Sequence, residues 1–317
     1  MADFVHLHNH TEFSLLDGLS KIPDVVARAK ELGMKALAIT DHGALYGAFK
    51  FYHECKKQGI KPIIVCEVYM AKRSLKDKEA EVDDDQNHLI LLAKNNIGYK
   101  NLMKLVTISH LEGFYYKPRL DLETIEKYHE GLICLTSCLN GFVAEPLMKG
   151  QVKDAEERAK KLDAIFGKDH LYLELQKHPH IEDQEKLNTQ LIDFSKKLGI
   201  PLVATNDNHY INPNDSYAQE VLLCIQTQTT MLDENRKLSM IGSPDFYLKS
   251  AEEMTGLFIQ TPEAIENTVK IANMVDLEIE TKKWVLPDFP VPDNQTPKEY
   301  LKKLVQEKMK NRYENPT

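Results

Sequence analysis

The sequence predicts an α/β barrel followed by a helical C-terminal extension. Apolar strand-like runs alternate with helix-like runs about seven times over the first 210 residues, which is typical of parallel strands joined by helical crossovers. Polar residues of metal-ligand type stand at the ends of these runs, where barrels carry their active sites. The alternative is an open doubly wound sheet. It normally has a glycine-rich phosphate turn after its first strand, and this sequence has none there.

Composition is that of an ordinary globular protein. The chain has 317 residues, 42% hydrophobic and 28% charged, enough for one large α/β domain or two ordinary ones. We find no apolar run long enough to span a bilayer and no signal-peptide pattern. Five widely spread cysteines favour a reducing cytoplasm over a disulfide framework. The net charge of −8 weakly opposes nucleic-acid binding, although bound metal cations would reverse the sign locally.

Hydrophobic periodicity places the elements of the barrel in order. Residues 21–33 form a helix because Ile22, Val25 and Val26 recur at helical spacing before Gly33. The strands expected by the same reasoning are 4–10, 36–40, 61–70, 88–94, 132–138, 170–175 and 201–205, and the further helices are 45–59, 100–111, 155–166 and 182–199. Residues 71–87 are charged and predict a surface loop, and residues 113–120 predict an aromatic and basic loop.

The character of the chain changes after residue 210, where helical patterns dominate. Helices are expected at 216–227 and after Thr261, which precedes a proline at the first helical position. Residues 284–297 hold four prolines and predict an extended linker, and residues 298–313 predict a charged amphipathic helix. We therefore expect a main domain of residues 1–278 and a second part of residues 279–317.

An H-x-H pair near the N-terminus is the first candidate metal site. His8 and His10 lie in FVHLHNHTEFSLLDG, and in an extended segment their side chains point to the same face. Two imidazoles on one face supply half of the ligands of a metal ion. Buried histidines satisfied by hydrogen bonds give the same pattern, so the pair alone leaves both readings open.

Seven later residues of ligand type lie in or beside predicted strands. They are Asp17, His42, Glu67, His88, Cys138, Asp207 and His209. Each is weak alone, since Cys138, for example, could be a small core residue. The joint pattern favours a metal site, because such residues interrupt strand after strand. Imidazoles, carboxylates and a thiolate suit zinc, or manganese or iron where oxygen ligands dominate, and nine ligands are enough for two or three ions.

The motifs that carry these residues resemble those of the PHP (polymerase and histidinol phosphatase) superfamily. HLHNHTEFSLLDG is similar to its first motif, and ITDHG, CEVY, NHLILLAKN, LTSC and ATNDNHY resemble the later motifs in the expected order. GIKPII, GYKNLMKLV, LEGFYYKPRLD and EGLICLTSC are similar to the PHP domains of bacterial DNA polymerase III α subunits in particular. The resemblance covers essentially the whole chain, and residues 279–317 resemble a linker and the first helix of a truncated polymerase palm.

The resemblance implies a distorted (βα)7 barrel with a site for three divalent ions, whose identity among zinc, manganese and iron stays open. It implies three ligand sets: His8, His10, Glu67 and Asp207 for one ion, Glu67, His88 and Cys138 for a second, and Asp17, His42 and His209 for a third. The palm's catalytic aspartates lie outside this chain in the family, so we do not expect it to polymerise DNA. Small-molecule phosphatases of the superfamily tend to have histidine where this chain has Cys138.

The leading functional hypothesis is metal-dependent phosphodiester hydrolysis, as a 3′→5′ exonuclease that proofreads DNA. A metal-bound water is the nucleophile rather than a protein side chain, and Asp207 and Glu67 are the catalytic carboxylates. The alternative is a metal-stabilised structural or docking module of the polymerase, and a histidinol-phosphate-type phosphatase is less favoured. The implied partners are DNA 3′ ends, the remainder of the α subunit, the sliding clamp and other replisome subunits, in the cytoplasm and without a membrane.

Two segments are candidates for substrate contacts. Tyr115, Tyr116, Lys117 and Arg119 could stack on a terminal base and pair with phosphate, or form an ordinary exposed loop. His178 and His180 form a second H-x-H, but a proline separates them. We interpret this pair as structural, with a position for His178 at the substrate rim as the minority interpretation. The other histidines, His6, His53, His110, His129 and His170, are expected to be structural or exposed.

Overall fold

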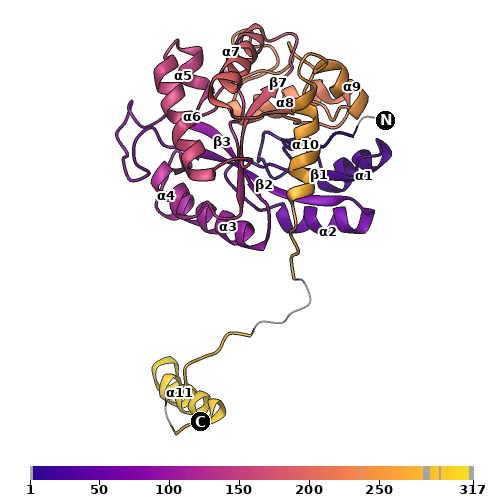
Figure 1. Ribbon diagram of the computed structural model, residues 1–317. Coiled ribbons are helices and arrows are strands. Elements are labelled where there is room, and N and C mark those ends of the chain that lie inside the picture. The colour runs from indigo at the N-terminus through magenta and orange to yellow at the C-terminus, as the bar shows by residue number, and fades with distance from the viewer. Residues whose placement is uncertain (1–2, 237, 281–285, 293, 314–317) are drawn as a thin grey trace. The chain divides into compact units, whose positions relative to one another are not determined.

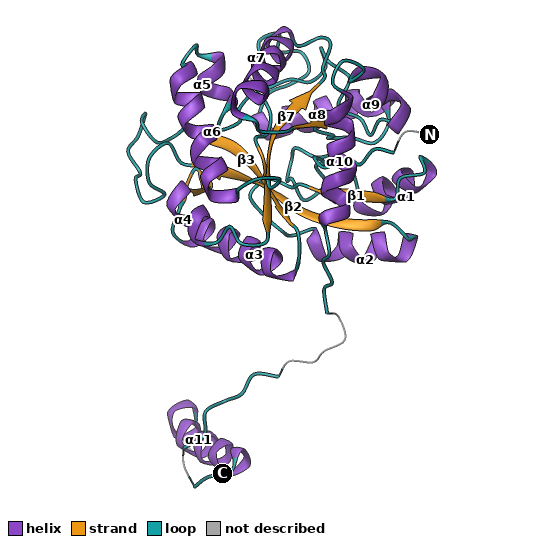
Figure 2. Ribbon diagram, in the orientation of Figure 1, coloured by secondary structure: helices purple, strands orange, loops and turns teal. Residues whose placement is uncertain are grey.

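A curved mixed sheet surrounded by helices forms the larger of two compact units (Figures 1 and 2). The structure, a computed structural model, describes residues 3–236, 238–280, 286–292 and 294–313. The two units are Met1–Glu278 and Ile279–Thr317, and each is described by itself.

The strands of the larger unit are short apart from the second. They are β1 (Ala36–Ile39), β2 (Lys61–Met70), β3 (Asn87–Ala93), β4 (Phe114–Tyr115), β5 (Lys117–Leu120), β6 (Leu132–Leu135), β7 (Leu171–Gln176) and β8 (Leu202–Thr205). The helices are α1 (Ile22–Glu31), α2 (Ala48–Gln58), α3 (Asn96–Leu111), α4 (Leu122–Lys127), α5 (Ala144–Met148), α6 (Val152–Phe166), α7 (Glu182–Leu198), α8 (Ser216–Thr227), α9 (Ala251–Leu257) and α10 (Pro262–Met274). Among the described residues, no helix combines the length and apolarity that crossing a bilayer requires.

The N-terminal segment 4–10 closes the sheet into a barrel. The strand order is β4-β5-β2-β3-β6-β7-β8, with β1 also paired to β2. On one side of the segment, the backbone N–H of Ala38 in β1 donates to the carbonyl of His6. On the other side, the N–H of Asn208, just after β8, donates to the carbonyl of His8 at 3.1 Å. Among the described residues, the closed ring therefore consists of seven extended segments, which confirms the predicted distorted barrel. They are segment 4–10, β1, β2, β3, β6, β7 and β8.

One strand runs against the predicted direction. The sequence predicts parallel strands throughout, but β3 is antiparallel to both β2 and β6. No helix lies between β2 and β3, so the chain lacks the helical crossover that returns a strand in parallel. The reversal puts the first residues of β3 at the barrel end where the parallel strands finish.

Smaller differences concern short elements. Segment 4–10 is extended but forms only an isolated bridge, Asn9 to Asn208, rather than the predicted strand. Residues 113–120, predicted as a loop, form the hairpin β4–β5. The helices α4, α5 and α9 were not predicted, because each has seven residues or fewer and carries little periodic signal.

The smaller unit contains helix α11 (Pro297–Arg312), close to the predicted 298–313. Its start is a capping box. The Thr296 hydroxyl accepts from the N–H of Glu299, and the Glu299 carboxylate accepts from the N–H of Thr296. Part of the predicted proline-rich linker, at residues 284, 285 and 293, lies outside the described residues.

Close packing of two glycines gives a test of the fold. A Cβ on Gly98, in the first turn of α3, would overlap the carbonyl oxygen of Gly131, which precedes β6. We expect Gly98→Ala to lower the free energy of unfolding by about 3 kcal/mol or more, because backbone must move. The control is Gly256→Ala in α9, where a Cβ meets open space and helix propensity should raise stability by about 0.5–1 kcal/mol. Urea denaturation of both variants measures the difference, and equal midpoints would contradict the packing described.

Candidate metal centre

Nine side chains of ligand type converge at the end of the barrel where its parallel strands finish. They are His8 and His10 of the closing segment, Asp17 of the next turn, His42 after β1, Glu67 in β2, His88 in β3, Cys138 after β6, and Asp207 and His209 after β8. His88 reaches this end because β3 is antiparallel. His42 lies beside Glu67 because the pairing of β1 with β2 continues as a parallel bridge between these two residues.

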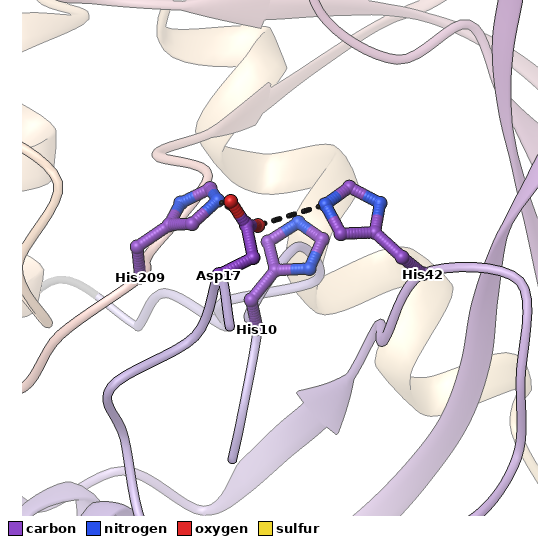
Figure 3. Close-up of side chains that lie close together, drawn as sticks. All are labelled: His10, Asp17, His42 and His209. Carbon is purple, nitrogen blue, oxygen red and sulfur yellow. Dashed lines mark hydrogen bonds and ion pairs between the residues drawn. The ribbon is translucent and has the colours of Figure 1, made fainter. Parts of the chain in front are cut away.

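The donor atoms fall into three groups, and within each the atoms lie within 4.8 Å of one another. Group 1 is His8, His10 and Asp207, group 2 is Glu67, His88 and Cys138, and group 3 is His10, Asp17, His42 and His209. Figure 3 shows group 3, in which the Asp17 carboxylate lies between His209 and His42. Its Oδ2 is 2.9 Å from His42 Nε2 and 3.1 Å from His209 Nε2.

Glu67 lies between the groups. Its Oε2 is 2.7 Å from His42 Nδ1, and its Oε1 is 3.1 Å from His88 Nδ1. The same carboxylate lies 3.7 Å from the Nε2 atoms of His8 and His10. Ser137 also donates a hydrogen bond of 2.5 Å to its Oε1. The side chain is 1% exposed, so these neighbours replace water as its partners.

Hydrogen bonds outside the groups fix which nitrogen of His10 carries the proton. The Ser14 hydroxyl donates its single proton to Asp41 at 2.9 Å, so it can only accept from His10 Nδ1, also at 2.9 Å. The Nε2 atom of the neutral ring then presents a lone pair to groups 1 and 3. This is the arrangement that outer partners impose on metal-binding histidines.

His8 and His209 are oriented in the same way. His8 Nδ1 donates to the buried carboxylate of Glu174 at 2.7 Å, and His209 Nδ1 donates to the backbone carbonyl of Asp207 at 2.8 Å. Glu174 is itself held by the hydroxyl of Thr205 at 2.5 Å. Each imidazole therefore turns Nε2 towards the cluster.

This arrangement fits bound cations. The Nε2 atoms of His8 and His10 lie 3.1 Å apart, so either a proton or a metal cation must lie between them, because two facing lone pairs would repel. His42 Nδ1 lies 2.7 Å from Glu67 Oε2, and Asp207 Oδ1 lies 3.0 Å from His8 Nε2, but neither atom makes a contact with hydrogen-bond geometry, which is costly for a buried polar atom unless another group satisfies it. Imidazoles, carboxylates and one thiol are donor types that suit divalent transition metals. These residues could therefore hold divalent metal ions.

The electrostatics of the site lead to the same conclusion. Burial alone would lower the pKa of His8, but the carboxylates of Asp207 and Glu174 overcome it and raise that pKa to about 10. The carboxylate of Glu67 likewise outweighs burial and raises the pKa values of His42 and His88 to about 10. Burial opposes ionisation of Glu67, yet the surrounding imidazoles hold its pKa well below its usual value. The carboxylates thus need positive charge beside them, from protons or from metal.

Cys138 belongs to the cluster as a thiol rather than as an evident nucleophile. Its Sγ lies 3.8 Å from His88 Nδ1. Burial raises its pKa above the ordinary value, more than the neighbouring imidazole lowers it. A cation is what would convert this thiol to a thiolate near neutral pH.

The hairpin β4–β5 lies next to the cluster. Lys117 is exposed, and its Nζ lies 5.4 Å from the centre of the Tyr69 ring. That ring stacks on His42 at 6.0 Å and meets His88 edge-on at 5.3 Å. Tyr116 is exposed and Tyr115 half-buried. The ring of Tyr69 therefore lies between Lys117 and the imidazoles of His42 and His88.

Arg119 does not lie where the sequence predicts. It was a candidate for contact with a substrate phosphate, with an ordinary exposed loop as the alternative, but its side chain is fully buried. The guanidinium donates to the backbone carbonyls of Gly113 and Asp83 at 3.1 Å and of Asp77 at 2.7 Å. It therefore fixes the loop 71–86 against the hairpin, and this prediction was wrong because residue type does not show which face of a hairpin is covered.

The second H-x-H does not converge. His180 is largely exposed, whereas His178 is buried and stacks on Phe246 at 4.1 Å with neither ring nitrogen hydrogen-bonded. Burial lowers the pKa of His178 to about 4, so the ring is neutral. His6, expected to pack structurally, is fully buried and bonds the carbonyl of Lys249 at 2.8 Å.

Sequence reasoning missed the partners that orient the cluster. Glu174, Ser137 and Asp41 contact His8, Glu67 and Ser14, and none was a candidate. Glu174 was detectable in principle, because an acidic residue inside the apolar strand LYLELQ needs a buried partner. Ser137 carried no signal, since a serine after a strand is ordinary turn chemistry.

Comparison with known proteins assigns the family. Residues 6–178 match the PHP domain, and the chain belongs to this family. The chain is 48% identical to DNA polymerase III subunit alpha of Borreliella burgdorferi (strain B31), over 99% of this chain and 27% of that protein. The proteins of the same name from Aquifex aeolicus and Thermus aquaticus are 43% and 40% identical, over 98% and 95% of this chain.

The chain spans about a quarter of the length of these curated relatives, from 25% to 28%. Among solved structures, a Bifidobacterium adolescentis protein assigned as a metal-dependent phosphoesterase overlaps 66% of this chain and 88% of its own length. Its TM-score is 0.42 and its sequence identity 13%.

The raised imidazole pKa values predict how metal and pH act together on stability. Stability from a protonated histidine is fully present below its unfolded pKa of about 6.5 and is lost as the pH rises through the folded value, here about 10 for His8, His42 and His88. The chelated protein should therefore lose thermal stability between pH 7 and pH 10. The metal-loaded protein, whose imidazoles are already deprotonated, should lose less. Scanning calorimetry of both forms measures Tm as a function of pH. Equal losses of Tm between pH 7 and pH 10 in the two forms would contradict this prediction.

Proposed function

We propose that this chain is a metal-dependent phosphodiesterase that degrades DNA as a 3′→5′ exonuclease. The observation that carries the proposal is the sharing of donors among the three groups. Glu67 contacts imidazoles of all three groups, and His10 belongs to two of them. Adjacent cations held this way suit phosphoryl chemistry, in which attacking and leaving oxygens both need charge stabilisation.

We assign nine ligands to three divalent ions, with zinc, manganese and iron as candidates. His8, His10, Asp207 and Glu67 would hold the first, Glu67, His88 and Cys138 the second, and Asp17, His42 and His209 the third. Such ions supply Lewis acidity, which acidifies water and stabilises charge on a phosphoryl group. The chain's own residues orient the site, because Glu174, Ser14 and Ser137 keep imidazoles and carboxylates turned inward.

Substrate access supports a polymeric phosphodiester. His42 and His88 are a fifth or less exposed, so solvent reaches the cluster on their side. Lys117 lies there, and among the described residues no acidic side chain pairs with it. A lysine in that position can hold a phosphate adjoining the scissile one, while Tyr116 and Tyr115 can contact a base.

The relatives suggest the biological setting. They are named as DNA polymerase III α subunits, so we propose that the chain acts in DNA replication in the cytoplasm and removes misincorporated 3′ nucleotides. Its partners would be the rest of such a subunit, the sliding clamp and other replisome subunits. We propose that residues 279–317 begin the palm of that polymerase, separate from the PHP domain of residues 1–278.

A structural role is the second candidate. The cluster is deeply buried, so metal bound to it would stabilise the fold by mass action whether or not catalysis occurs. A docking module that keeps its metals for stability would have the same donors. Measurements of cleavage and of stability together separate the two functions.

Asp207→Asn tests the proposal with little change in side-chain volume. We expect the wild-type chain with manganese or zinc to shorten a 5′-labelled single strand one nucleotide at a time. Loss of a ligand should slow this about 100-fold or more, since even outer partners of metal ligands are worth about 10- to 100-fold. Asp193→Asn, on the exposed face of α7, is the matched control and should leave the rate unchanged.

Three outcomes decide the matter. A strand blocked at its 3′ end should resist degradation, and cleavage that starts from the 5′ end would contradict the proposed 3′→5′ direction. Equal rates for Asp207→Asn and wild type would place the activity elsewhere. Absence of cleavage by the wild type, together with a large fall in Tm on chelation, would favour the structural role.

A further inference from the structure

Four exposed apolar side chains lie on the loops that carry or adjoin the residues of the cluster. Leu15 is 66% exposed, Leu16 49%, Tyr46 62% and Tyr116 67%. Leu15 and Leu16 occupy the turn between Ser14 and Asp17, both of which contact the cluster. Tyr46 follows His42, and Tyr116 stands at the tip of β4–β5. Other apolar side chains of the described residues are exposed far from the cluster in sequence, such as Leu232 and Ile259, so these four are distinguished by their place on the segments that carry or adjoin the candidate ligands.

Contacts place these loops next to one another. The Ser14 hydroxyl accepts from the backbone N–H of His42 at 3.2 Å, which packs the turn 14–17 against the loop after β1. Gly43 then meets the hairpin, since a Cβ there would lie 2.8 Å from Pro118 and 3.1 Å from Tyr69. The turn, the loop and the hairpin thus form a continuous rim. The turn and the loop lie beside Asp17 and His42 of group 3, and the hairpin lies beside Tyr69, which contacts His88 of group 2.

Two of the exposed apolar residues adopt a backbone conformation that disfavours them. Leu16 has φ +61° and Tyr116 has φ +56°, the left-handed region that glycine and asparagine occupy more readily. Exposing a large apolar side chain and straining its backbone are both unfavourable. Leu16 and Tyr116 each combine the two unfavourable features, exposure and a left-handed backbone, and both residues lie on this rim. Backbone strain of this kind concentrates at functional sites.

The chemistry of the rim selects its occupant. Lys117 lies 5.4 Å from the centre of the Tyr69 ring beside the hairpin, and no acidic side chain among the described residues pairs with it. Lys50, 5.5 Å from the ring of Phe13 beside the turn, is ion-paired with Glu12 at 2.7 Å and is therefore partly neutralised. Apolar surfaces beside an unpaired lysine match a strand of unpaired nucleotides, whose bases have apolar faces and whose backbone is anionic. Duplex DNA would present only phosphates and groove edges to such a rim.

We propose that Leu15, Leu16, Tyr46 and Tyr116 form a nucleobase platform that holds unpaired bases of the DNA strand entering the metal centre. The inference rests on the proposed function and adds to it the requirement for bases. The platform would make the enzyme prefer single-stranded or frayed ends, because only unpaired bases expose their faces.

The test compares DNA with and without bases. The substrates are a 5′-labelled single strand and the same strand with abasic residues near its 3′ end. The full chain is assayed as wild type, Leu16→Asn and Tyr116→Asn, with Ile259→Asn as a control on an exposed apolar residue between α9 and α10. Asparagine fits the left-handed backbone, so the two rim variants should keep or raise the Tm of the wild type.

We expect wild type and control to cleave the normal strand about ten times more efficiently, in kcat/KM, than the abasic strand. Each rim variant should lose most of that preference, because its kcat/KM for the normal strand should fall while its kcat/KM for the abasic strand stays unchanged. Leu16→Gly repeats the test should the asparagine variant fold poorly. A wild type that cleaves both strands equally, or rim variants that keep the preference, would overturn the platform and leave the nuclease standing. A wild type that cleaves neither strand refutes the proposed function itself.

Discussion

A buried carboxylate without water must find positive charge, and Glu67 sets this constraint for the whole molecule. It is held in the longest strand of the barrel, at 1% exposure, and it draws imidazoles from three other segments around it. Removing water makes each of these contacts stronger than it would be at a surface, and makes an unpaired charge correspondingly costly. His42 and His88 lie within 3.1 Å of this one carboxylate and His8 lies within 3.7 Å, and protons or metal ions complete its neutralisation.

Two features of the barrel, its closure by the N-terminal segment and the reversed direction of β3, bring these partners together. Closure by the N-terminal segment places His8 and His10 between β1 and β8, so the first residues of the chain meet residues that follow the last strand. The reversed strand β3 delivers His88 to the same end. Outer hydrogen bonds then orient the rings, as the Glu174 bond to His8 shows. The same end of the barrel carries the exposed apolar rim, so the chemistry and the proposed base contacts share one set of loops.

Much of the fold was accessible from the sequence, because long periodic segments report their own secondary structure. The barrel, its main helices and the boundaries of β2 and α8 were predicted closely. The direction of β3 was not, since periodicity carries no information on strand polarity. Residue type nominated the nine side chains that the structure brings together. Residue type could not reveal that Arg119 turns inward, because this depends on how the loop 71–86 covers the hairpin. Nor could it reveal that Ser137 donates a hydrogen bond to Glu67, because this depends on the direction of the chain after β6.

Glu67 contacts imidazoles of all three donor groups, so we propose that it joins three cation sites into one centre, and the metal stoichiometry of the chain decides whether it does. Inductively coupled plasma mass spectrometry of the chain purified without chelator should find three divalent ions. Glu67→Gln keeps the shape but removes the shared charge, so it should lose at least two ions, whereas Glu130→Gln on the surface should lose none. Fewer than two ions in the wild type, or full occupancy in Glu67→Gln, would contradict the account.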